Sequence, residues 1–307
     1  MLEIVKKGPM TTVQDAGRTG HQAEGVRPSG ACDPFAFGIA NRLAGNPPDA
    51  AALEFTLSGG AVRFTRGGCF AFSGADMPLT LNGRMIEKDR CHAVSAGDVL
   101  EIGMARAGLR GYLAVGGGID TAPCLGSRSS EKPPETGEIV PAGGGPFRPR
   151  RADADALRKT ASRVRLTDGG AIPVLRYVPG PQEERFEPAD FDRNIYTVRT
   201  DSDRMGVRMD GEALASGAGY DILSDGIAPG AIQISGGGLP VVMQAAHQTT
   251  GGYAKIGTVI TADLKVLAQL RPGERVCFSR VTPDEARAYL INERQRMEEI
   301  GHADDRP

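Results

Sequence analysis

The side chains best suited to chemistry gather in one short stretch, Gln244–Lys255, which has the sequence QAAHQTTGGYAK. An imidazole or an amine can move protons in a reaction. Hydroxyl groups and glycine N–H groups can hold an oxyanion. The residues that we predict to be catalytic are His247, Thr249, Thr250, Tyr253 and Lys255, and those predicted to bind substrate beside them are Gln244 and Gly251. The stretch is therefore either a wall of an active site or a polar connection between strands.

A second polar cluster follows the first predicted strand, where Gln14, Asp15 and Arg18 share a glycine-rich loop. The planar guanidinium fork of arginine suits a carboxylate or a carbamate. We predict that these side chains bind a polar substrate, with the alternative that they only staple a turn, since such turns are frequent. Arg204, in DSDRMG after the predicted strand Ile195–Val198, is a further candidate for substrate binding or part of a surface charge cluster.

Glu54 is a carboxylate within an apolar strand, AALEFT. If that strand is buried, the carboxylate must be paired or neutral. We expect its neighbours to be Asn41, Arg42 and Asn46. Because structural pairs outnumber catalytic acids, the favoured interpretation is a buried ion pair that holds the first lobe.

Composition and motifs give no support to several classes of protein. The net charge is -2, which provides no basic field for nucleic acid or an anionic membrane. The five cysteines are widely spaced without CxxC, and the four histidines are scattered, so we predict reduced thiols, a cytoplasmic protein and no metal site. No P-loop, no GxSxG motif, no apolar run long enough to span a membrane and no biotin-carrying lysine context is present.

Short apolar runs broken by 42 glycines and 21 prolines predict many short strands and tight turns. Without regular βαβ alternation, these strands favour barrel-like or sandwich lobes. One helix is predicted to begin at Asp33-Pro34, and another at Thr282, where TPDE forms a capping box. The predicted boundaries are 1–150 for an N-terminal β-rich lobe, 151–163 for a linker, 164–281 for a second lobe and 282–300 for a C-terminal helix.

Long motifs in a fixed order resemble one known family. They are TTVQDAGRTGHQAEGVRPSGA with its continuation to EFTLSG, then YLAVGGGI and LGSRS, then TDSDRMGVRMDG and GAIQISGGGLPVVMQAAHQTTGGYAK. These motifs resemble the allophanate hydrolase subunit 2, or biotin-dependent carboxyltransferase, family over residues 1–279. Within that family the chain is most similar to the stand-alone C subunits of 5-oxoprolinases.

The resemblance implies a mainly β fold with two β-barrel-like, cyclophilin-like lobes. It also implies a subunit of an ATP-dependent 5-oxoprolinase that opens 5-oxoproline to glutamate, active only with a subunit-1-like protein (the B subunit) and the A subunit of that enzyme. ATP would bind at the level of the complex, and this chain would carry no covalent biotin. Two alternatives stay open: a carboxyltransferase subunit that moves CO2 from carboxybiotin to urea or a related amide, and a regulator that binds a subunit-1-like kinase inhibitor.

Several candidate residues match the motifs of the family. In the 5-oxoprolinase interpretation Arg204 and Arg18 bind the substrate carboxylate, and Gln244 with Thr249 or Thr250 orients its amide. Lys255 neutralises a phosphate or carbonyl oxygen. Gly251 and Tyr253 also match, whereas the position of His247 varies in the family, which shifts the emphasis from the imidazole to its neighbours.

Overall fold

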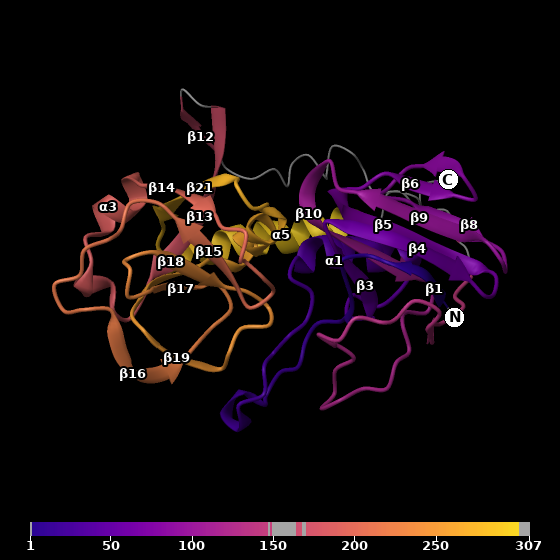
Figure 1. The fold of residues 1–307 in the computed structure, drawn as a ribbon, viewed down its shortest axis with the longest axis horizontal. Coiled ribbons are helices and arrows are strands. Elements are labelled where there is room, and N and C mark those ends of the chain that lie inside the picture. Colours follow the sequence, from indigo (N-terminus) through magenta and orange to yellow (C-terminus); the bar gives the residue numbers. More distant parts are fainter. Residues whose placement is uncertain (1, 147, 149–163, 168–169, 301–307) are drawn as a thin grey trace. The chain divides into compact units, whose positions relative to one another are not determined.

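Strands dominate both parts of the chain, as Figure 1 shows. The computed structural model describes residues 2–146, 148, 164–167 and 170–300. The chain divides into two units, the first made of Met1–Arg18, Ser29–Thr160 and Gln295–Pro307 and the second of Thr19–Pro28 and Ala161–Arg294. The predicted linker at 151–163 lies outside the described residues.

Unit 1 consists of two β-sheets and a helix. The six-stranded sheet has the order β11 (Ile139–Val140), β1 (Leu2–Lys7), β4 (Ser58–Phe64), β9 (Val99–Met104), β6 (Leu79–Leu81), β7 (Arg84–Ile86). The five-stranded sheet has the order β2 (Met10–Gln14), β3 (Ala52–Thr56), β10 (Ala107–Val115), β5 (Gly68–Asp76), β8 (Cys91–Val94). Among the described residues of unit 1 neither sheet closes on itself.

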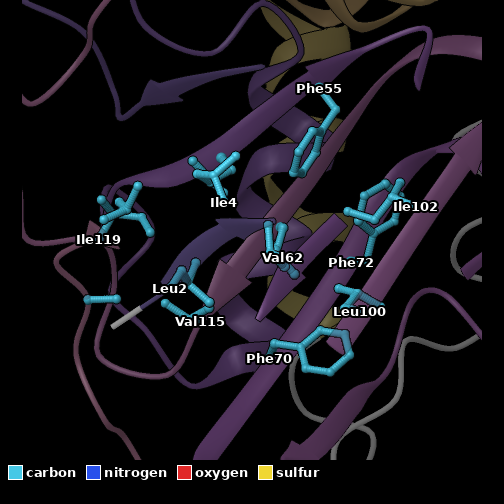
Figure 2. Packing of buried hydrophobic residues seen from close by; sticks show 14 of the residues in the cluster. Leu2, Ile4, Phe55, Val62, Phe70, Phe72, Leu100, Ile102, Val115 and Ile119 are labelled. Carbon is cyan, nitrogen blue, oxygen red and sulfur yellow. The ribbon is translucent and has the colours of Figure 1, made fainter. Parts of the chain in front are cut away.

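In unit 1, successive side chains along the strands face two separate apolar clusters. Phe55 and Phe72 of the five-stranded sheet join Leu2, Val62 and Ile102 of the six-stranded sheet in one core, shown in Figure 2. The next residues along the strands of the five-stranded sheet face the other way and are covered by helix α1 (Pro34–Ala44) in a second cluster. Successive strand residues point to opposite faces, so one sheet serves both layers.

Helix α1 begins and ends where the sequence predicts. The Asp33 side chain accepts hydrogen bonds from the backbone N–H groups of Phe35 and Ala36, and Pro34 occupies the first helical position. Gly45 ends the helix in the left-handed conformation with φ 78°.

Unit 2 contains a closed barrel of seven strands. Around it run β13 (Gly170–Pro179), β20 (Lys255–Val259), β17 (Ala231–Ile234), β18 (Pro240–Met243), β15 (Gly206–Asp210), β14 (Ile195–Val198) and β21 (Arg275–Arg280). The ring closes because β13 pairs with β20 on one side and, in parallel, with β21 on the other. The prediction of two barrel-like lobes is therefore confirmed for unit 2, whereas in unit 1 it is wrong: two open sheets enclose the core there.

The remaining elements of unit 2 surround the barrel. Strand β12 (Val164–Thr167) pairs antiparallel with the start of β13, and β16 (Asp221–Gly226) pairs with β19 (Thr250–Tyr253) as a separate two-stranded ribbon. The short helices are η1 (Gln22–Glu24), η2 (Glu183–Arg185), α3 (Pro188–Arg193), η3 (Thr261–Asp263) and α4 (Leu264–Gln269).

The predicted C-terminal helix is present as α5 (Pro283–Ile300). Its capping box forms as expected, since the Thr282 N–H donates to Glu285 Oε2 at 2.8 Å and the Glu285 N–H donates to Thr282 Oγ1 at 3.3 Å. The Arg176 guanidinium, which is ion-paired with Asp263, lies 3.7 Å from the ring centre of Tyr289 and holds the helix against the barrel.

Candidate functional site

The loop that follows β18 contacts the DSDRMG segment directly. The Gln244 N–H donates to the Met205 carbonyl and the Ala246 N–H donates to the Arg204 carbonyl, both at 2.9 Å. Arg204 itself is 6% exposed. The structure thus brings Arg204 next to the Gln244 loop, and the alternative of a surface charge for Arg204 is wrong.

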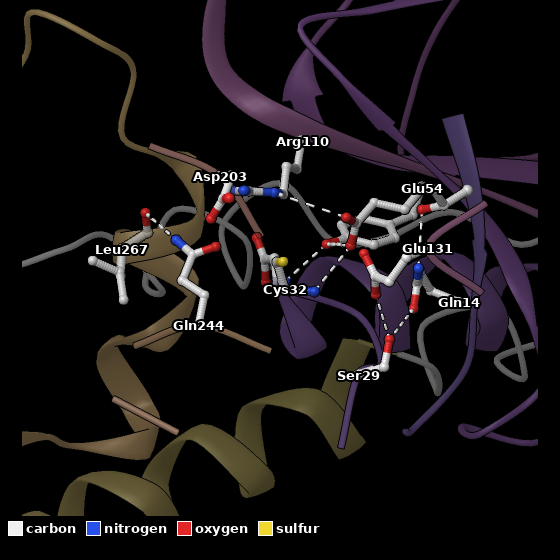
Figure 3. A network of polar contacts seen from close by, with 12 residues as sticks. Gln14, Ser29, Cys32, Glu54, Arg110, Glu131, Asp203, Gln244 and Leu267 are labelled. Carbon is white, nitrogen blue, oxygen red and sulfur yellow. Dashed lines mark hydrogen bonds and ion pairs between the residues drawn. The ribbon is translucent and has the colours of Figure 1, made fainter. Parts of the chain in front are cut away.

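Two hydrogen-bond acceptors in this loop are buried without a partner among the described residues. Gln244 Nε2 donates to the Leu267 carbonyl at 3.5 Å (Figure 3), but no described residue donates to its Oε1. His247 is 1% exposed, and its Nδ1 lies 2.7 Å from the Gln248 carbonyl, which places the ring proton on Nδ1. Nε2 then keeps its lone pair and has no partner. Burial lowers the pKa of His247, so the ring is neutral at pH 7.

Lys255 begins strand β20 and is a buried cation. Its side chain is 6% exposed, and Nζ lies 3.0 Å from Asp225 Oδ2 on the neighbouring ribbon. This distance makes an ion pair, but the two groups lack the alignment of a hydrogen bond. The side chain of Asp225 is 46% exposed, so the pair connects the buried amine to the surface.

The hydroxyl groups of the loop are more exposed than its imidazole and amine. Thr250 and Tyr253 lie on β19 and are exposed, and Thr249 and Gly251 are half-buried. The stretch from His247 to Lys255 therefore passes from the interior of unit 2 to its surface and back.

Gln14, Asp15 and Arg18 form hydrogen bonds within unit 1. Asp15 accepts from the Ser127 and Ser129 hydroxyls at 2.7 and 2.6 Å and from the Arg128 N–H at 2.5 Å. Burial raises the pKa of Asp15, but the hydrogen bonds of these groups outweigh it and hold the pKa below its ordinary value.

The other two side chains of this cluster bind the same distant segment. Arg18 donates to the carbonyls of Cys124 and Ser129, each at 2.9 Å. Gln14 is fully buried and donates to the Ser130 carbonyl at 3.0 Å. These hydrogen bonds thus hold residues 124–130 against the end of β2 and the loop after it, more than a hundred residues away. Substrate binding by Gln14, Asp15 and Arg18 stays a prediction.

Glu54 is buried and paired, as its strand predicts. It accepts from the Tyr112 hydroxyl at 2.7 Å and from the Cys32 N–H at 2.9 Å, and Arg110 Nε lies 3.8 Å away (Figure 3). Asn41 and Asn46, which we expected beside it, donate instead to the backbone carbonyls of Ala50 and Val115.

Sequence reasoning missed one polar residue of unit 2, Gln233. It is 2% exposed in strand β17, and its Nε2 has no hydrogen-bond partner among the described residues. The only local signal is an amide between two isoleucines in AIQI. Within the described ranges, no group of three or more His, Cys, Asp or Glu side chains is placed to hold a metal ion. No described helix is long and apolar enough to cross a membrane.

The chain matches one family model and is similar to several individual proteins. A family model described as carboxyltransferase domain, subdomain A and B, matches residues 24–280. The C subunit of 5-oxoprolinase from Escherichia coli (strain K12) is 34% identical over 310 residues, which cover 98% of this chain and 97% of that protein. Urea amidolyase of Lachancea kluyveri is 30% identical over 93% of this chain and 17% of its own length.

Solved structures agree with the sequence relatives. The crystal structure of the K. lactis urea amidolyase matches with a TM-score of 0.88 and 27% identity, over 97% of this chain and 20% of that chain. This chain therefore spans a fifth of the length of that protein.

Proposed function

Because the chain belongs to the carboxyltransferase domain family, subdomains A and B, we propose that it is one subunit of an ATP-dependent 5-oxoprolinase complex. Such a complex opens the lactam of 5-oxoproline to give glutamate. The observation that carries the proposal is the match to the C subunit of the E. coli 5-oxoprolinase, which extends over 98% of this chain and 97% of that protein. The same subunit of Haemophilus influenzae is 32% identical over 93% of each chain.

The side chains of unit 2 offer groups suited to a lactam that bears a carboxylate. The guanidinium of Arg204 would bind the carboxylate. The Oε1 of Gln244, buried without a partner in the described part of the chain, would accept the lactam N–H. The neutral ring of His247 has a free lone pair at Nε2 and could take up a proton during hydrolysis.

The Lys255 amine would stabilise the negative charge that develops on the attacked carbonyl or on a phosphate oxygen. Because Lys255 is 5% exposed, this charge would be stabilised away from bulk water, where such an interaction is strongest. The threonine hydroxyls at 249 and 250 would orient the amide from the exposed side of the loop.

The proposed partners are a subunit-1-like protein (the B subunit) and the A subunit of 5-oxoprolinase. ATP would bind on one of those partners or where they meet this chain, since the sequence contains no P-loop.

The test is ATP-dependent hydrolysis of 5-oxoproline by the chain co-expressed with its A and B partners. The variant Arg204→Ala, Lys255→Ala is expected to lose turnover, while the control Lys7→Ala, Arg193→Ala, which changes two exposed side chains, keeps it. If the wild-type complex does not hydrolyse 5-oxoproline, the proposed function is wrong. Normal turnover by the Arg204, Lys255 variant refutes the site assignment alone.

A second candidate function is transfer of CO2 from carboxybiotin to urea or a related amide. The TM-score of 0.88 to the K. lactis urea amidolyase favours it. Biotin would then be carried by a partner protein. Urea-dependent decarboxylation of carboxybiotin by the complex, without 5-oxoproline hydrolysis, would select this function over the first.

A further inference from the structure

A polar layer lies on the outer face of the barrel, where the β16–β19 ribbon covers strand β17. Ile232 and Ile234 of β17 point into the barrel core. The residue between them, Gln233, therefore faces outward. On that side it meets the ribbon, because a Cβ placed on Gly251 would lie 2.6 Å from Gln233 Nε2 and 2.7 Å from Ile227 Cδ1.

Lys255 shares this face with Gln233. The two residues are paired in register between β17 and β20, next to a β-bulge at Ile232/Gln233. Side chains of paired residues lie on the same face of a sheet, with Cβ atoms about 5 Å apart. Ile256, the next residue along β20, belongs to the barrel core, which confirms that Lys255 points outward.

Both side chains end in donors that have hydrogens to spare within the described part of the protein. Gln233 Nε2 carries two hydrogens and has no partner, and Lys255 Nζ carries three and has one ion-pair contact, with Asp225. A buried donor without an acceptor lowers the stability of the fold, and an acceptor bound between these two neighbouring donors would recover that loss.

The charge of the layer selects the kind of acceptor. Asp225 lies 3.0 Å from Lys255 Nζ and balances its positive charge, while Gln233 is neutral. A site with no net charge favours the oxygen of a neutral carbonyl over a free carboxylate, because a carboxylate would be repelled by Asp225.

We propose that Gln233 Nε2 and Lys255 Nζ together bind the carbonyl oxygen of a small amide ligand, beneath the β16–β19 ribbon. The inference rests on the proposed function in taking an amide as the substrate class, and it adds Gln233 as a substrate-binding residue. Gly251 leaves space for the Gln233 amide itself, since any larger residue there would displace it.

The experiment measures amide binding to the complete complex by titration calorimetry, with 5-oxoproline and urea as the probes. Gln233→Met removes the donor and keeps the shape of the side chain, and Gln295→Met makes the same change at an exposed position of α5 as the control. Gln233→Met is expected to raise the Kd of the bound amide about five- to tenfold, the effect of one hydrogen bond. Its thermal unfolding midpoint should equal or exceed that of wild type, because an unpaired buried donor has been removed.

Two results would contradict this inference. An unchanged Kd in Gln233→Met, or an unfolding midpoint several degrees lower, overturns the inference, since the amide group then binds only water or protein. Should Gln233→Met fail to accumulate, Gln233→Asn, which withdraws the donor by one methylene, must weaken binding in the same way.

Failure of the proposed function can be told apart from failure of the inference about Gln233. A wild-type complex that hydrolyses 5-oxoproline, with the KM unchanged in Gln233→Met, refutes the inference alone. A complex that binds urea but not 5-oxoproline, with urea binding weakened in Gln233→Met, refutes the proposed function alone. A wild-type complex that binds neither amide refutes both.

Discussion

Replacing Glu54 by alanine is predicted to destabilise unit 1 strongly. The carboxylate is 1% exposed, accepts from the Tyr112 hydroxyl and the Cys32 N–H, and lies beside the Arg110 guanidinium, itself 3% exposed. Removing one member of a buried ion pair costs about 3–5 kcal/mol, because the other charge stays in a poorly solvated position. We expect Glu54→Ala to lower the free energy of unfolding by about that amount.

Two further variants divide this loss between hydrogen bonding and charge. Tyr112→Phe removes the hydrogen bond to the Glu54 carboxylate, worth about 1.5–3 kcal/mol, and also the acceptor of the Asp33 N–H, so it should cost at least that amount. Glu54→Gln keeps an acceptor but removes the charge, and should cost less than Glu54→Ala. Since Glu54 and Tyr112 share a bond, the double variant should lose about 1 kcal/mol less than the sum of the single losses.

Urea unfolding followed by circular dichroism at pH 7 measures each value. A loss below about 1 kcal/mol for Glu54→Ala would refute the reasoning, because it is the size expected of a surface pair. Strictly additive losses for Glu54 and Tyr112 would show that the two groups do not stabilise each other.

Three other predictions concern pH and helix capping. The pKa of Asp15 is lowered, so its contribution to stability is complete above the unfolded pKa of about 3.9 and is lost as the pH falls through the folded pKa. Asp15→Asn should be destabilised in urea at pH 7, and its difference from wild type should shrink as the pH falls below about 3.9. The pKa of His247 is also lowered, so just below pH 6.5 the unfolded chain binds more protons than the folded chain. The free energy of unfolding should therefore fall less between pH 7 and pH 5 in His247→Gln than in wild type. An equal fall in both proteins would contradict the burial argument. Thr282→Ala removes the cap of α5 and should lower the free energy of urea unfolding by about 1 kcal/mol. A change within roughly 0.2 kcal/mol, the error of the measurement, would show that the capping box does not stabilise the helix.

Local signals predicted the parts of the fold that local chemistry determines. Asp33 and Thr282 cap their helices as expected because a cap needs only residues two or three positions away. The burial of Glu54 followed from the apolar strand around it, but its partners Tyr112 and Arg110 lie more than fifty residues along the chain and no local pattern connects them.

The sequence did not predict which of the two units closes its sheet, since barrel-like lobes were expected in both. Strands of both units have similar lengths and breaks, and whether a sheet closes depends on which distant edges pair. Gln233 was missed for a related reason: its significance comes from Lys255 on the adjacent strand and from the ribbon above it, not from its own neighbours in sequence.

The seam of the barrel has a consequence for how the protein is made. Val174 of β13 pairs with Cys277 of β21, about 100 residues later, and this parallel pairing completes the ring. A ribosome must therefore release almost all of unit 2 before β13 can find its last neighbour, and contacts this distant in sequence form slowly. Until then β13 presents an open edge that another chain can pair with, so synthesis and folding of unit 2 pass through a stage at which aggregation competes with closure.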